Sequence, residues 1–234
     1  MHIRPSAGPA AAAALCAAWL VSTLPAAAVA EQGYRLKPLK EAPPKDVSKE
    51  LRAVLGKQGF RIAGPDGKPF VDGWLVKHIV TREDEKELGI NFGQVREGTL
   101  LGVLRFARAG KDFRGNRFKA GTFTFRYTLQ PEDGDHLGAS ESRDFALLCP
   151  AKEDAKPAPL APEKVVKLSV KVSGRKHPCT LHLMKMVGES KKLPRVFERQ
   201  DLEYWLLDCQ IPDKETKKKP VRLGLVLVGQ AEEF

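Results

Sequence analysis

The sequence predicts an all-β protein, an antiparallel β-sandwich of about eight to nine strands with one short N-terminal helix. Residues 121–129 alternate strictly between apolar and polar side chains, with Phe123, Phe125, Tyr127 and Leu129 on one face. This period of two is typical of a strand with one buried face, because successive side chains of a strand point to opposite sides. Further short apolar runs follow, separated by turn residues, and little of the chain has helical periodicity.

Residues 1–30 are predicted to be a secretory signal peptide. His2 and Arg4 form a short basic start, residues 10–24 are apolar, and the run Ala28-Val29-Ala30 has the small-x-small pattern of a cleavage site. An uncleaved anchor helix is the alternative, although the apolar run is shorter than a membrane span. We therefore expect an extracytoplasmic protein, periplasmic or secreted, with no transmembrane span once the signal is removed.

The predicted elements after the signal begin with a short strand at 34–36. The only expected helix covers residues 46–57, where Asp46 or Ser48 can cap its start and Gly59 can end it. The other expected strands are 60–63, 71–80, 100–106, 121–129, 144–149, 166–172, 179–187, 202–209 and 221–228.

Residues 31–234 are predicted to form a single β-sandwich domain. The Pro/Ala-rich stretch 151–163 is interpreted as an exposed loop that crosses it. A split into two subdomains at 151–163 is the alternative, but only four strands would follow it, which is few for an independent core.

The chain is basic, with 39 Lys and Arg against 29 Asp and Glu and a formal net charge of +10. Removal of the signal takes away one basic residue and no acidic one, so the charge falls only to +9. The densest basic run, 214–220, lies where a hairpin turn is expected, and no basic helix or aromatic RNA-binding signature accompanies it. We therefore expect no nucleic-acid partner, but attraction to an anionic envelope glycan or to another envelope protein.

Three cysteines follow the signal: Cys149, Cys179 and Cys209. In an oxidising compartment three cysteines allow at most one intrachain bridge. A disulfide between Cys179 and Cys209 is favoured because both lie in strand-like runs, and closing that loop would contribute about 3–4 kcal/mol. The alternative is three buried, unpaired thiols.

The segment 130–138, QPEDGDHLG, is the most unusual stretch of the chain. Asp133, Asp135 and His136 lie within four residues of one another. Their carboxylates suit Ca²⁺ and the imidazole suits a transition metal, so these three are the candidate metal ligands. If strands 121–129 and 144–149 are neighbours, the segment caps one end of the sandwich.

Four further polar residues are expected near this segment: Asp112, Arg114, Arg143 and Asp144. Together with Asp135 and His136 they form the candidate ligand-binding set. A second interpretation is catalytic, with His136 as a general base oriented by an acid. A third is structural, a turn-rich loop in which Arg114 or Arg143 pairs with an aspartate.

A second group of metal-binding side chains is His177, Cys179 and His182. It lacks the companion pairs that a tetrahedral zinc site needs, and Cys179 and His182 face opposite sides of a strand. The chain contains no Gly-x-Ser-x-Gly, no His-Glu-x-x-His and no phosphate-binding glycine loop. These patterns identify no cofactor and no catalytic residue.

Several blocks of the chain resemble a group of uncharacterised secreted bacterial β-sandwich proteins, which carry an (A/P)GTYT-type strand and a DGDHLG loop. The blocks are Gly98–Gly102, Asp112–Gly115, Ala120–Tyr127, Asp133–His136, Arg143–Phe145 and the ending Val226–Glu233. Phe123 stands where tyrosine is usual in that strand. The resemblance implies an exported sandwich and carries no established activity.

These observations favour a non-enzymatic module that binds a ligand or a partner outside the cytoplasm. The alternative is an extracytoplasmic metal-dependent hydrolase that uses the acidic and histidine-containing loop 130–138. A further alternative is an envelope scaffold without a small ligand.

Overall fold

The computed structural model of the protein describes residue 2 and residues 33–83, 86–131, 140–190, 192–215 and 218–231. Ten strands form one antiparallel sheet, in the neighbour order β1-β2-β3-β4-β7-β8-β9-β12-β11-β10. Their bounds are β1 Arg35–Leu39, β2 Gly59–Ala63, β3 Pro69–Leu75, β4 Leu100–Phe106, β7 Gly121–Leu129, β8 Asp144–Pro150, β9 Thr180–Lys185, β10 Arg195–Arg199, β11 Tyr204–Ile211 and β12 Val221–Val228. The sheet nearly closes into a barrel, because the two outermost strands of this order, β1 and β10, contact each other.

The prediction of an antiparallel all-β fold is confirmed, but the division into two sandwiched sheets is wrong. Strand β8 pairs with both β7 and β9, so the N-terminal and C-terminal strands share one continuous ladder. A sandwich and a nearly closed sheet both bury one face of every strand, and the alternating sequence pattern is the same in both. Three of the strands were not predicted. One is β10 at the end of the strand order, and the other two, β5 (Gly110–Lys111) and β6 (Arg117–Phe118), form a separate hairpin.

The hydrophobic core follows the alternation along the strands. In β7, Phe123, Phe125 and Tyr127 belong to the main core cluster, as the sequence pattern predicts. The intervening Thr124 and Arg126 are equally buried, on the opposite face of the same strand. Both faces of β7 are therefore covered, and the second covering comes from segments outside the sheet.

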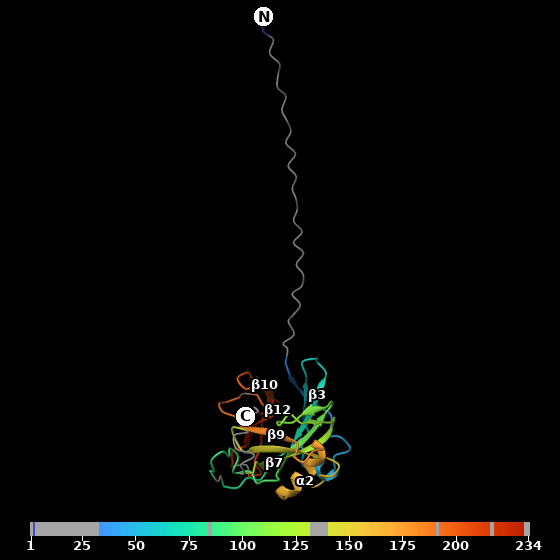
Figure 1. Ribbon diagram of the computed structural model, residues 1–234, viewed down its shortest axis with the longest axis vertical. Coiled ribbons are helices and arrows are strands. Elements are labelled where there is room, and N and C mark those ends of the chain that lie inside the picture. Colours follow the sequence, from blue (N-terminus) through green and yellow to red (C-terminus); the bar gives the residue numbers. More distant parts are fainter. Residues whose placement is uncertain are drawn as a thin grey trace. The chain divides into compact units, whose positions relative to one another are not determined.

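One of these coverings is the helix α2, Pro162–Ser173, which corrects the strand predicted at 166–172. Its buried residues Val165, Leu168 and Ser169 follow helical spacing, and they pack over β8. Pro162 starts the helix, and Gly174 ends it in a left-handed conformation with φ of 64°. Figure 1 shows α2, in orange, at one side of the strands.

The other covering is residues 151–161, here called the strap. The side chain of Arg126 is fully buried beneath it and forms two hydrogen bonds with Asp154, at 2.6 and 2.8 Å. Arg126 also donates to the backbone carbonyls of Gly98, Lys156 and Ala158. The stretch predicted as an exposed loop is therefore fastened to the sheet, and Glu31–Phe234 forms one compact unit.

A second helix, α1, covers Lys49–Val54 and is shorter than the predicted 46–57. Its start is capped by Ser48, whose hydroxyl accepts a hydrogen bond from the backbone N–H of Leu51. The same hydroxyl donates to the carbonyl of Ala155 in the strap. In the part of the chain that the structure describes, no helix is long and apolar enough to cross a membrane.

The three cysteines that the structure describes, Cys149, Cys179 and Cys209, are free and buried, so the predicted disulfide between Cys179 and Cys209 is not formed. Strand β12 lies between β9 and β11, and Cys209 is opposite Leu223, which is opposite Lys185. Lys185 is six residues beyond Cys179, about 20 Å along a strand, whereas a disulfide requires Cα atoms within about 7 Å. Burial raises the pKa of all three thiols, that of Cys149 to about 12.

Candidate ligand-binding site

A cavity of about 900 Å³ lies on the outer face of β7 and β8, beside α2. Its walls come from the residues after β5, the N-terminal half of α2, the segment between α2 and β9, and the end of β12. Cavities of roughly 300–1,000 Å³ are the usual size for small-molecule sites. The sheet and its coverings thus leave a space that a small ligand fits.

The floor of the cavity is apolar. Phe145 and Leu147 of β8 line it, because they alternate with Ala146 and Leu148, which belong to the main core. The side wall is formed by Val166, which lies on the exposed part of α2. Phe145 and Leu147 are themselves buried, so little of their surface is open to the cavity, whereas Val166 is 38% exposed and offers accessible apolar surface there. Accessible apolar surface inside a hollow is typical of a ligand site.

The rim of the cavity carries an excess of positive charge. Among the described residues that line it, four are cationic, namely Arg114, Arg143, Lys167 and Lys176, and two are acidic, namely Glu97 and Glu163. Arg114, Lys167 and Lys176 are exposed. The formal charge of this lining is therefore +2 with His177 neutral, which favours a ligand with an anionic group.

Arg143 is oriented by the residues around the cavity. Its Nε donates to the carbonyl of Gln130 at 3.0 Å, and its Nη1 pairs with Glu87 at 2.7 Å. Glu97 also lines the cavity, and its Oε2 accepts from the Thr128 hydroxyl and the Leu129 N–H. The carboxylate of Glu97 and the guanidinium of Arg143 are thus both held in place by hydrogen bonds from or to the protein itself.

The other two predicted residues that the structure describes, Asp112 and Asp144, do not reach the cavity. Asp112 is buried, and its Oδ1 accepts from the N–H groups of Arg114 at 3.0 Å and Asn116 at 2.7 Å. Burial raises the pKa of Asp112, and these hydrogen bonds offset part of that rise. Its role is to shape the turn that presents Arg114 to the cavity.

Asp144 has a comparable structural role at the start of β8. Its carboxylate accepts from the backbone N–H groups of Asn91 at 2.7 Å and Phe92 at 3.2 Å. The hydroxyl of Tyr127 donates to it at 2.7 Å. Burial, followed by the charge of Asp144, raises the pKa of Tyr127. The carboxylate of Asp144 thus joins the loop before β4 to the sheet.

The structure therefore brings Arg114 and Arg143 to one cavity and uses Asp112 and Asp144 as local scaffolding. The predicted metal ligands Asp133, Asp135 and His136 lie outside the described residues. The sequence reasoning missed the four cavity residues Phe145, Val166, Lys167 and Lys176. Val166 and Lys167 lie on α2. The helix-start residue Pro162 and the helix-end residue Gly174 were the sequence features from which this helix, and so these two residues, could have been predicted.

The second histidine group also separates. Cys179 belongs to the main core, whereas His182 lies between the rings of Phe113 and Phe145, with centroids 4.8 and 5.1 Å away. Its Nε2 is 3.3 Å from the Ser142 hydroxyl, and its Nδ1 has no hydrogen-bond partner. Within the described ranges, no group of three His, Cys, Asp or Glu side chains could hold a metal ion.

Burial lowers the pKa of His182 to about 4, which predicts a loss of stability in mild acid. An unfolded histidine titrates near 6.5, so between pH 6.5 and 4 the unfolded chain binds a proton that the folded chain does not. Stability from this group is therefore complete above pH 6.5 and falls by up to about 3 kcal/mol at pH 4. Urea unfolding of wild type and His182→Gln across this range measures it. The difference in free energy of unfolding between wild type and His182→Gln should shrink toward pH 4. The control His177→Gln, which changes an exposed histidine, should have the same pH dependence as wild type.

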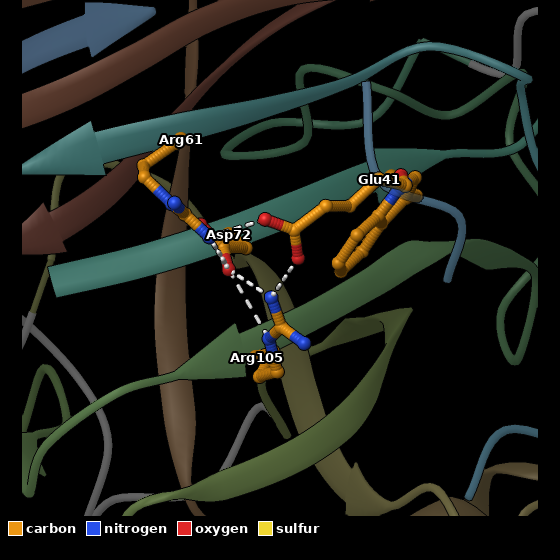
Figure 2. A network of polar contacts seen from close by, with 5 residues as sticks. Glu41, Arg61, Asp72 and Arg105 are labelled. Atoms are coloured by element: carbon orange, nitrogen blue, oxygen red, sulfur yellow. Dashed lines mark hydrogen bonds and ion pairs between the residues drawn. The ribbon is translucent and has the colours of Figure 1, made fainter. Parts of the chain in front are cut away.

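A different polar cluster lies on the outer face of β2, β3 and β4 (Figure 2). Arg61 and Arg105 flank Asp72, at shortest distances of 2.6 and 2.5 Å, and both also contact Glu41. Burial alone would raise the pKa of Asp72, but hydrogen bonds from the two arginines outweigh it and hold that pKa below its ordinary value. Two arginines face two carboxylates here, so the charges cancel. The cluster fastens the residues after β1 to the sheet and leaves no unbalanced charge for an anion.

Comparison of this chain with protein-family models, curated proteins and solved structures finds no match.

Proposed function

We propose that this protein is a non-enzymatic, extracytoplasmic binding module that holds a small amphiphilic anion in the cavity beside α2. The observation that carries the proposal is the pairing of an apolar floor with a cationic rim. A ligand with an aliphatic body and one acid group would match both parts, because burial of the body and charge attraction at the head then act together.

The composition of the cavity favours an aliphatic ligand over a glycan. A sugar needs several hydrogen-bonding groups around it, because each buried hydroxyl without a partner costs free energy. On the β7 and β9 side, the Thr128 hydroxyl already donates to Glu97, and the Thr180 hydroxyl alone has no partner. In place of the expected envelope glycan, we therefore propose an anionic ligand with a long apolar part.

The hydrolase alternative has less support from the described residues. Both carboxylates that were expected beside the cavity, those of Asp112 and Asp144, accept hydrogen bonds from backbone N–H groups and point to structural roles. The acids and the histidine of segment 132–138 lie outside the described residues. A binding role therefore rests on observed geometry, and a hydrolytic role does not.

Titration with dansylaminoundecanoic acid, a fluorescent fatty-acid analogue, tests the proposal. Wild type should bind the probe saturably, and Val166→Trp should raise Kd at least tenfold, because the indole would occupy the part of the cavity next to Val166 where the aliphatic chain is expected to lie. Val187→Trp is the matched control, since Val187 is 82% exposed and does not line the cavity. Absence of saturable binding to wild type, or equal Kd values for the two tryptophan variants, would contradict the proposed function.

A further inference from the structure

The hairpin formed by β5 and β6 carries a concentrated positive charge next to the cavity. Over residues 110–119, all of them described, the basic side chains Lys111, Arg114, Arg117 and Lys119 are exposed. The only acid of the segment, Asp112, is fully buried and bonded within its own turn. Its charge is therefore directed inward, and the exposed surface of the hairpin is purely cationic.

The hairpin is rigidly attached to the rest of the fold. Phe113 and Phe118 are buried, each in a hydrophobic cluster. The backbone of Phe113 donates to the Thr180 carbonyl at 2.8 Å and accepts from the Ala231 N–H at 2.8 Å. Side chains held on such a base lose little further backbone entropy when they meet a charged surface.

The position of the hairpin relates its charge to the cavity. Arg114 lines the cavity of the proposed function, whereas Lys111 and Arg117 line a second hollow of about 570 Å³. Gln230 lines both hollows, so the hairpin lies between them. Arg108 also faces the second hollow but is paired with Asp66, and Glu203 is the one acid in the described lining there.

We propose that this hairpin docks the protein on an anionic lipid surface, with the cavity beside α2 facing the headgroup layer. The inference rests on the proposed function, because an amphiphilic anion is concentrated in membranes rather than in free solution. Each of the four exposed cations is expected to increase the binding constant for an anionic bilayer about fivefold, and salt weakens this attraction. A lipid surface is favoured over an anionic polysaccharide because the adjoining cavity has an apolar floor that accommodates an acyl chain.

Co-sedimentation of the full-length mature chain with lipid vesicles tests the docking. Wild type should sediment with phosphatidylcholine vesicles that contain phosphatidylglycerol, should stay in the supernatant with pure phosphatidylcholine, and should be released by high salt. Lys111→Glu/Lys119→Glu should reduce the binding at least twentyfold, since two attractions become repulsions. Lys57→Glu/Lys192→Glu is the matched control, because both lysines are exposed, lie outside the hairpin and change the net charge equally.

Three outcomes separate the two proposals. Equal loss of sedimentation in the hairpin variant and in the control would overturn the docking surface, because only net charge would then matter. Hairpin-dependent binding to soluble dextran sulfate that exceeds the binding to vesicles would also overturn it, in favour of an anionic polysaccharide. Both charge variants should bind dansylaminoundecanoic acid like wild type. Failure of wild type to bind that probe, with hairpin-dependent sedimentation intact, would reject the cavity function and leave the docking surface standing.

Discussion

Asp154→Ala is expected to lower the free energy of unfolding by about 3–5 kcal/mol. The side chains of Arg126 and Asp154 are 0% and 1% exposed, so the change would leave a buried guanidinium without its counter-ion. The strap would also lose its fastening, because the Thr124 hydroxyl donates to the same carboxylate. Urea unfolding measures the stability, and limited proteolysis within 151–161 should accelerate in the variant.

A matched control is Asp66→Ala, which breaks an ion pair with Arg108 whose side chains are 39% and 42% exposed. Exposed pairs contribute about 0–1 kcal/mol, so this variant should unfold almost like wild type. Arg126→Met/Asp154→Leu should recover part of the stability lost in Asp154→Ala, because no unpaired charge then remains buried. A structural role for the buried ion pair would be contradicted if Asp154→Ala lowered the free energy of unfolding no more than Asp66→Ala does.

Gly98→Ala is expected to lower the free energy of unfolding by roughly 2–5 kcal/mol. Gly98 has a φ of 77°, where a side chain costs about 1–2 kcal/mol. A Cβ at this position would also lie 1.8 Å from the carbonyl oxygen of Leu160 in the strap, and forced overpacking adds about 1–3 kcal/mol. The strap would have to move away from the Gly98 backbone, whose carbonyl also accepts a hydrogen bond from Arg126.

Gly67→Ala separates the two causes. Gly67 has a φ of 73°, but a Cβ there would meet nothing within 4 Å. Its substitution should therefore cost only the conformational strain, about 1–2 kcal/mol. Thermal or urea unfolding of both variants measures the loss of stability. Equal losses in Gly98→Ala and Gly67→Ala would show that the close contact with Leu160 does not contribute.

Much of the sheet was predictable because a strand with one buried face has a local signature. Strand β7 shows this clearly, since the apolar set that includes Phe125 and Tyr127 alternates without interruption. Helix α2 was missed because its valines also alternate with lysines, which suits a half-buried strand. Its terminal residues, Pro162 and Gly174, carried the correct information.

The strap is a loop, as predicted, but its fastening to the sheet could not be predicted. Arg126 occupies a polar position of an alternating strand, and such positions are ordinarily exposed. Its burial depends on Asp154, nearly thirty residues later, which returns to cover it. A contact of that range leaves no periodic pattern in the sequence.

The candidate site was predictable only in part. Arg143 follows the acidic segment 130–138 and Arg114 lies upstream of it, and the structure places both at the cavity. The cavity itself is bounded by several segments that are far apart in the sequence, so no local motif predicts it. The aspartates Asp112 and Asp144 looked chemically available because the sequence does not show the backbone N–H groups that surround them.

The order of strands in the sheet has a consequence for how the chain acquires its structure. Strands β1 to β4 pair successively, and so do β7 to β9 and β10 to β12. Contacts between sequence neighbours form with a small loss of chain entropy. Among the strands that are hydrogen-bonded neighbours in the sheet, β9 and β12 are the farthest apart in sequence, by about forty residues, so their pairing has the largest loss of chain entropy. This pairing joins the last three strands to the rest of the sheet. We expect the rate-limiting step of folding to be the late pairing of β9 with β12, which joins the sheet of β10–β12 to the other strands.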